Sequence, residues 1–211
     1  ELSNQTRIGP IIDSEFYHET ISRDRLFITF CGQLSKHVDM DRALDYCDFA
    51  LGILKEGLIE FHEHNPDYKI VLGGNIDVMS KINFLLEKYE LTFVEYGHYS
   101  HKDYYDNIDR AVAVICPASI TTMLESITYG TPFIVLPEQD LSHFKNYEGM
   151  TTGANCQVKD RLETIFPGCL LMSYSDILGF VPDTIQNLYQ TMKKIVNGEF
   201  PQITAKMKES Y

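Results

Sequence analysis

The sequence predicts an α/β protein with a doubly wound, Rossmann-like parallel sheet of about six strands. Short apolar runs alternate with segments whose apolar residues recur every three or four positions, which is typical of strand–helix–strand units. The runs are apolar throughout, as expected of parallel strands that are covered on both faces. At 211 residues, of which 44% are hydrophobic, the chain is long enough for one such domain with a sizeable core.

The amino-terminal half is expected to supply three strands and two helices, the first of them long. The first strand is Arg25–Cys31 (RLFITFC). In the helix that follows, from Asp41 to about His64, Leu44, Cys47 and Leu54 belong to one apolar stripe. The remaining elements of this half are expected to be a strand at 69–72, a helix at 78–89 and a strand at 91–96.

The carboxyl-terminal half continues the alternation. Its strand Ala111–Cys116 (AVAVIC) is the most continuous apolar run. The other expected elements are a short helix near 102–108, a helix at 120–129, a strand at 132–136, a weaker last strand at 154–158 and a helix at 182–196. The tail at 199–211 is polar with only a weak helical signal.

One folded domain is expected at 23–198, between a linker at 1–22 and the tail at 199–211. The chain begins with polar residues and without Met, which suggests a piece of a longer protein. The net charge of −12 argues against broad binding to nucleic acid or anionic membranes, because both need clustered cationic side chains. No apolar run reaches about eighteen residues, so no transmembrane segment is expected.

The cysteines favour a reducing, cytoplasmic location. There are five, they are scattered, and no C-x-x-C pair occurs. His98 and His101 have H-x-x-H spacing, but no acidic or cysteine companion accompanies them, so no metal site is expected.

Several turns fall at the carboxyl ends of the expected strands, where doubly wound sheets bind their ligands. They are the turns at 32–35, 97–100, 117–122 and 137–142. This convergence predicts one binding site, and it does not depend on any single motif.

The turn at 117–122 has the chemistry of a phosphate site. It opens a helix, so unpaired backbone N–H groups and hydroxyls collect at the positive end of the helix dipole. Glu125 follows Thr122 by three residues. Its carboxylate either turns back on the helix start in a capping box or reaches a sugar hydroxyl of a bound nucleotide.

These residues resemble the nucleotide-sugar-binding half of GT-B glycosyltransferases. The resemblance is to the bacterial muramyl-pentapeptide N-acetylglucosamine transferase and to the UDP-glucuronosyl and macrolide transferases. It rests on Cys116–Glu125 (CPASITTMLE), the Gly130-Thr131-Pro132 turn and the strand Phe133–Pro137 (FIVLP). Many members have His at 117 and glycines at 118, 119 and 121, so this chain places more bulk near the phosphates.

The resemblance implies that the chain is the C-terminal half of a GT-B fold, with no cofactor beyond its UDP-sugar donor substrate. It assigns the donor diphosphate to Gly32, Ser35, Ser119, Ile120, Thr121 and Thr122. It assigns the ribose to Glu125, the base to Tyr99 and Ser100, and the sugar to Glu138, Gln139 and Asp140. The same residues also have ordinary structural interpretations: Gly32 and Ser35 as a strand-to-helix turn, and Asp140 or Ser142 as a helix cap.

Three functions are compatible with the sequence, and a fourth is disfavoured by it. The first is the donor-binding domain of a glycosyltransferase, separated from an N-terminal acceptor domain and therefore of low activity alone. The second is a GT-B-type nucleotide-sugar hydrolase or epimerase. The third is a non-catalytic nucleotide-sugar-binding or partner domain, favoured by the missing glycines. The fourth, an NAD-binding domain, requires a G-x-G-x-x-G fingerprint that Cys31–Ser35 does not supply.

Overall fold

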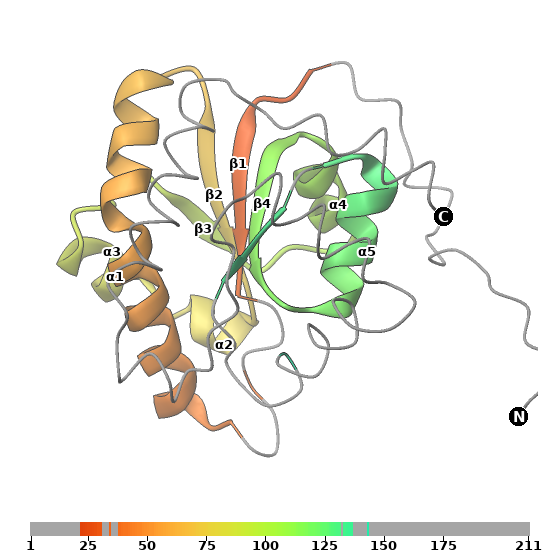
Figure 1. Ribbon diagram of the computed structural model, residues 1–211. Helices are drawn as coiled ribbons and strands as arrows, with labels where there is room; N and C mark the ends of the chain where they lie inside the picture. The colour runs from red at the N-terminus through yellow and green to blue at the C-terminus, as the bar shows by residue number, and fades with distance from the viewer. Residues whose placement is uncertain (1–21, 31–33, 35–37, 132, 137–142, 144–211) are drawn as a thin grey trace, which may run out of the picture.

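A five-stranded, wholly parallel sheet forms the centre of the computed structural model, with helices on both faces (Figure 1). The structure describes residues 22–30, 34, 38–131, 133–136 and 143. The strands lie in the order β3-β2-β1-β4-β5, and each neighbouring pair is parallel. This confirms the predicted doubly wound, Rossmann-like class. The described part holds five strands rather than about six, and the expected sixth, at 154–158, lies outside it.

The strands are short and mostly buried. They are β1 (Arg25–Thr29), β2 (Lys69–Gly73), β3 (Glu95–Gly97), β4 (Ala111–Pro117) and β5 (Phe133–Leu136). Every residue of β1, β4 and β5 is buried, as expected of parallel strands covered on both faces. The edge strand β3 is more exposed because it has a neighbour on one side only.

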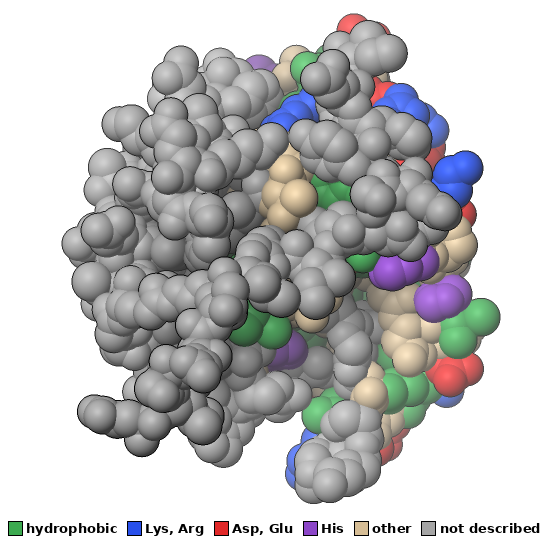
Figure 2. Space-filling model, turned by 90° about the vertical axis from the view of Figure 1, so that its right-hand side faces the viewer, with side chains coloured by type: hydrophobic (Ala, Val, Ile, Leu, Met, Phe, Trp, Pro, Cys, Tyr) green, Lys and Arg blue, Asp and Glu red, His purple; other side chains and the backbone are tan. Residues whose placement is uncertain are grey.

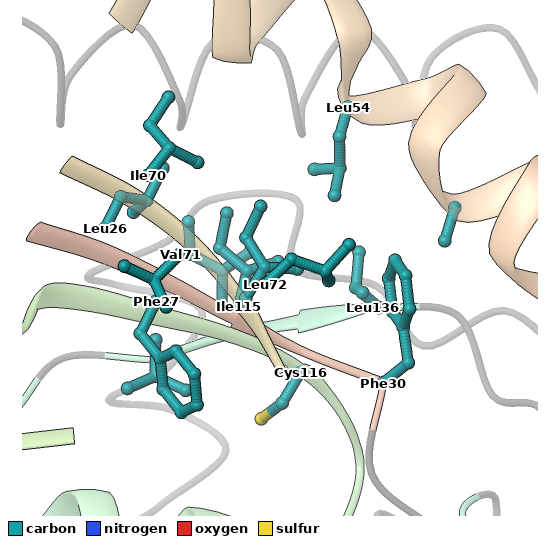
Figure 3. Close-up of a cluster of buried hydrophobic side chains, with 14 of the residues drawn as sticks. Leu26, Phe27, Phe30, Leu54, Ile70, Val71, Leu72, Ile115, Cys116 and Leu136 are labelled. Carbon is teal, nitrogen blue, oxygen red and sulfur yellow. The ribbon is translucent and has the colours of Figure 1, made fainter. Parts of the chain in front are cut away.

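The helices form two layers. They are α1 (Met40–His64), α2 (Ile76–Met79), α3 (Asn83–Lys88), α4 (His101–Asp109) and α5 (Ile120–Tyr129). Figure 1 shows α1 and α3 on one side of the sheet and α4 and α5 on the other. Strand side chains alternate between these layers: Leu26 and Ile70 point toward the face that α1 covers, whereas Phe27 and Cys116 point to the opposite face (Figure 3).

The segment expected to be one helix at 78–89 is two short helices, α2 and α3. Ser80 closes α2, since its hydroxyl donates to the carbonyl of Asp77 (2.6 Å) and so competes with continued helical bonding. The predicted continuous helix is therefore wrong at this point.

The strand expected at 91–96 begins only at Glu95. After α3 the backbone of Glu90 takes a left-handed conformation (φ 60°), and the N–H of Leu91 donates to the carbonyl of Leu86 (2.8 Å). A second bond from Glu90 to Glu87 (3.1 Å) completes a Schellman cap. Leu91 is buried as part of this cap rather than as a strand residue.

The amino-terminal edge of the sheet is closed by a polar network. Arg25 is buried there and donates to Asp24 (2.8 Å) and to Asn107 (2.6 Å), while Asp24 also pairs with Arg110. Burial alone would raise the pKa of Asp24, but the hydrogen bonds and charges of Arg25 and Arg110 outweigh it, so the net pKa is lowered. The polar side chains where the strands begin thus pair with one another. The cleft lies at the other end of the sheet, where the strands finish.

The remaining predicted segments fall outside the described residues. These are the linker at 1–22 apart from residue 22, the helix at 182–196 and the tail at 199–211. Among the helices that the structure describes, none combines the length and the apolar character needed to cross a membrane.

Candidate functional site

A cleft of about 370 Å³ opens at the carboxyl edge of the sheet. It is lined by Thr29 at the end of β1, Gly74 and Asn75 after β2, His98 and Tyr99 after β3, His101 and Tyr104 of α4, and Ser119, Thr121, Thr122 and Glu125 at the start of α5. Figure 2 views the molecule from the side of α4 and α5 and shows histidine side chains at the surface beside polar and hydrophobic atoms. Turns from separate parts of the chain therefore meet in one cavity.

The structure brings five of the proposed site residues into this cleft. They are Tyr99, Ser119, Thr121, Thr122 and Glu125. Ile120 is half exposed and does not line the cleft. Ser100 caps α4, since its hydroxyl accepts from the N–H of Asp103 (3.2 Å) and donates to that residue's carboxylate (2.6 Å). Gly32, Ser35, Glu138, Gln139 and Asp140 lie outside the described residues.

The hydroxyls at the start of α5 are connected to each other and to α4. Thr122 Oγ1 lies 2.8 Å from the phenol oxygen of Tyr104 and donates to Ser119 Oγ over 3.4 Å. Because the hydroxyl proton of Thr122 is donated to Ser119, the hydroxyl oxygen of Thr122 accepts the hydrogen bond from Tyr104. Ser119, at the end of this chain, keeps a hydroxyl proton that can be donated to a ligand.

Glu125 does not form the capping box. Because α5 begins at Ile120, Thr122 lies inside the first turn rather than at the cap. The carboxylate of Glu125 instead accepts a hydrogen bond from the phenol of Tyr105 (3.2 Å) through Oε1. Within the part of the chain that the structure describes, the other oxygen, Oε2, has no hydrogen-bond partner.

Burial makes Glu125 an unusual acid. The residue is only 7% exposed, and this desolvation raises the pKa of its carboxyl to about 7, while the hydrogen bond from Tyr105 acts in the opposite direction. A buried acceptor without a partner is costly, and such groups gather at binding and catalytic sites. Glu125 therefore has the character of a ligand-binding residue.

Two tyrosines form an aromatic wall beside Glu125. Phe27 of β1 supports both in edge-on contacts, with ring centroids 6.3 Å from Tyr99 and 5.4 Å from Tyr104. Burial raises the pKa of Tyr99, and the charge of Glu95 adds to this effect, so its phenol stays neutral. The cleft thus offers two aromatic side chains next to a hydrogen-bonding acid.

Six lining residues were not predicted as binding residues. They are Thr29, Gly74, Asn75, His98, His101 and Tyr104. Asn75 caps α2 by accepting from the N–H of Asp77 (2.9 Å), and His98 Nδ1 donates to the carbonyl of Gly74 (3.2 Å). Gly74 and Asn75 directly follow β2, so applying the strand-end rule to that strand identifies this turn.

The described residues hold no cluster of three or more side chains suited to a metal ion. The described part of the lining has no Lys or Arg either, and Glu125 is the sole carboxylate there. The arrangement can therefore recognise neutral hydroxyls and an aromatic ring directly. Among the described lining residues, the groups that can bind an anion are N–H groups, hydroxyls and imidazoles.

A substitution at Gly73 tests how tightly this glycine packs against Phe27 and Tyr99, beside the cleft. A Cβ at this position would lie 3.1 Å from a ring carbon of Phe27 and 3.2 Å from one of Tyr99, closer than ordinary contact. We expect Gly73→Ala to lower the free energy of unfolding by about 1–2 kcal/mol, since both rings must move. The matched control is Gly97→Ala, whose Cβ would meet Tyr99 only at 3.9 Å. Denaturant unfolding that finds both variants equally stable would contradict this packing.

Neither a protein-family model nor a curated protein matches the sequence. Among solved structures, the chain is similar to a provisionally assigned UDP-N-acetylglucosamine 2-epimerase from Listeria monocytogenes, with 14% identity, a TM-score of 0.39, and coverage of 83% of this chain and 43% of that one. It is also similar to the glycosyltransferase SnogD from Streptomyces nogalater, with 12% identity, a TM-score of 0.34, and coverage of 97% and 47%.

A third similar structure is the glycosyltransferase of kitacinnamycin, with 10% identity, a TM-score of 0.31, and coverage of 97% and 46%. The chain spans less than half the length of each of these structures. Similarity at these scores assigns neither a family nor an activity. The chain's own strand order and parallel pairing establish that it is a doubly wound, Rossmann-like α/β protein.

Proposed function

We propose that the chain is the donor-binding domain of a GT-B glycosyltransferase, which transfers a sugar from a UDP-sugar to an acceptor. The observation that carries the proposal is the buried, half-satisfied carboxyl of Glu125 beside the hydroxyls that begin α5. A nucleotide sugar presents the matching groups in the same order: a ribose diol next to a diphosphate. The acceptor-binding half would belong to another part of the protein.

The diphosphate would bind at the start of α5. Ser119, Thr121 and Thr122 line the cleft there, and the backbone N–H groups of the first helical turn carry the positive end of the helix dipole. Neutral donors of this kind hold an anion without a cationic side chain. During transfer they would stabilise the charge that builds on the leaving diphosphate.

The nucleoside would occupy the inner part of the cleft. Oε2 of Glu125 would accept a hydrogen bond from a ribose hydroxyl, and the base would lie against the wall formed by Tyr99 and Tyr104. Gly32 and Ser35, proposed for the diphosphate, and Glu138, Gln139 and Asp140, proposed for the sugar, remain assignments by resemblance.

Deprotonation of the acceptor needs a general base. Glu125 is the one carboxylate in the described lining, and it is assigned to donor binding. The resemblance to GT-B enzymes implies that the acceptor half supplies the base, so we expect the chain alone to bind donor and turn over little.

A second candidate is a non-catalytic nucleotide-sugar-binding domain. Ala118 is fully buried, and its methyl group, with the side chains of Ser119 and Thr121, adds bulk where close backbone approach to phosphate favours glycine. A hydrolase or epimerase would share the donor features and differ in the rest of the protein.

Calorimetric titration of the chain with UDP, UDP-glucose, GDP and NAD tests the proposal. We expect UDP and UDP-glucose to bind, and Glu125→Ala to weaken them about 10- to 100-fold, because a hydrogen bond to a charged group contributes about 1.5–3 kcal/mol. Glu63→Ala, which removes an exposed carboxylate on α1, is the matched control and should leave binding unchanged.

The outcomes separate the candidate functions. If no nucleotide binds, the donor-domain assignment is wrong and a partner domain is favoured. If UDP-glucose binds, product analysis of the longer protein with and without an acceptor distinguishes transfer from hydrolysis. Sugar release that does not need an acceptor would support the hydrolase.

A further inference from the structure

Two consecutive tyrosines of α4 each contact a polar side chain of α5. Tyr104 pairs with Thr122 over 2.8 Å, and Tyr105 donates to Glu125 over 3.2 Å. Helices α4 and α5 lie side by side on one face of the sheet (Figure 1). Thr122 and Glu125 of α5, which both line the cleft, are thus each held by a tyrosine of the neighbouring helix.

Tyr105 is more deeply buried than Tyr104. The residue is buried, and its ring packs between His101 (centroids 4.5 Å apart) and Tyr129 (5.8 Å). A tyrosine has few rotatable bonds, so this packing fixes where its hydroxyl lies. The phenol is therefore a rigid donor aimed at one oxygen of Glu125.

Because of this contact, the two carboxylate oxygens of Glu125 differ in their hydrogen bonding. A carboxylate has about four acceptor sites, and Tyr105 uses one of them on Oε1. Oε2 has no partner among the described residues although Glu125 is 7% exposed and lines the cleft. One oxygen is held in place and the other is left for a ligand.

We propose that Tyr105 is a positioning residue: its phenol holds Oε1 of Glu125, directs Oε2 at a hydroxyl of the bound ligand, and sets the pH range in which that hydrogen bond forms. The inference rests on the proposed function, in which the ligand is a nucleotide sugar.

The pH dependence follows from the two opposing influences on Glu125. Burial raises the pKa of its carboxyl to about 7, and the hydrogen bond from Tyr105 lowers that pKa. The ionised carboxylate is the stronger acceptor for a ligand hydroxyl. Affinity should therefore rise as the pH rises through about 7, and loss of Tyr105's hydroxyl should move this rise to higher pH.

Other titratable groups lie in the cleft or next to Glu125. His98 and Tyr99 after β3 and His101 and Tyr104 of α4 line the cleft with it. Tyr105 contacts Glu125 directly, Tyr129 of α5 packs against Tyr105, and Cys116 of β4 points to the same face of the sheet as Phe27 (Figure 3). A variant that removes only the acidic group isolates its contribution.

The test is calorimetric titration with UDP-glucose, which has no group titrating between pH 6 and 8, at pH 6, 7 and 8. We expect the protein to bind about tenfold more tightly at pH 8 than at pH 6, as a pKa of about 7 requires. Tyr105→Phe should move the midpoint up by about one pH unit, and Glu125→Gln should abolish the rise. Tyr68→Phe, the same change at the opposite edge of the sheet, should match the unaltered protein.

A second measurement keeps the two proposals distinguishable. Carbon-13 NMR of the Glu125 carboxyl in the free protein reports its titration without any ligand. If UDP-glucose binds but Tyr105→Phe leaves both midpoints unchanged, the positioning role is overturned and donor binding stands. If UDP-glucose binds neither the unaltered protein nor any variant, donor binding is overturned. In that case, an unchanged titration midpoint of the Glu125 carboxyl in Tyr105→Phe would overturn the control of Glu125 by Tyr105 as well.

Discussion

Replacing Glu125 by glutamine is expected to raise the free energy of unfolding at pH 8 by up to about 3 kcal/mol, even though it removes the acid proposed to bind the ligand. In the folded protein the pKa of this carboxyl is raised from 4.5 to about 7, chiefly by burial. Each unit of such a shift corresponds to about 1.4 kcal/mol of folding free energy. Glutamine has nearly the same shape and keeps an acceptor for Tyr105, but it carries no charge to desolvate.

The sign of the effect depends on which state holds the proton. Between pH 4.5 and about 7 the folded protein binds more protons at Glu125 than the unfolded chain does. Its stability therefore falls as the pH rises across this window, and the loss is complete above about pH 7. Below pH 4.5 both states are protonated, so the variant should have no electrostatic advantage there.

Urea unfolding at half-unit steps from pH 4 to pH 8 measures this dependence. The difference between Glu125→Gln and the unaltered protein should grow through the window and then level off. Glu63→Gln makes the same chemical change at an exposed position of α1 and should show no such growth. A constant difference across all pH values would mean that Glu125 ionises as readily in the folded state as in the unfolded one. Stabilisation together with lost ligand binding is the pattern expected of a functional residue.

Truncation of Phe27 to alanine is expected to cost about 3–5 kcal/mol of stability and to damage the cleft as well. The ring is fully buried on β1 and points away from the face that α1 covers (Figure 3). It supports Tyr99 and Tyr104, the two aromatic rings that line the cleft. A cavity beneath them would leave both rings free to move.

Phe61→Ala is the matched control for this prediction. Phe61 is equally buried, but it packs against Tyr68, which directly precedes β2 and therefore lies at the opposite end of the strands from the cleft. Both alanine variants should lose similar stability, and only the Phe27 variant should lose affinity for UDP-glucose. Phe27→Leu, a milder change, keeps the comparison possible if the alanine variant does not fold. Equal affinity in the Phe27 and Phe61 variants would show that the aromatic wall takes no part in binding.

The sequence was sufficient for the class of fold and for the end of the sheet at which the cleft lies. Wholly apolar runs such as Ala111–Cys116 can be satisfied only by burial on both faces, so a parallel sheet between two helical layers follows from local composition. The carboxyl ends of parallel strands meet at one edge. For that reason, the convergence of the turns holding Tyr99 and Ser119 in one cleft could be predicted from the sequence.

The properties of individual site residues were decided by the tertiary structure. The sequence left Glu125 with two roles, because a capping box and a ligand-binding acid share the same three-residue spacing. Only the packing of α4 against α5 buries this carboxyl and places the phenol of Tyr105, twenty positions earlier, within 3.2 Å of it. Local patterns determine which segments become strands and helices. Desolvation and hydrogen-bond geometry at the site depend instead on contacts between segments that are distant in the chain.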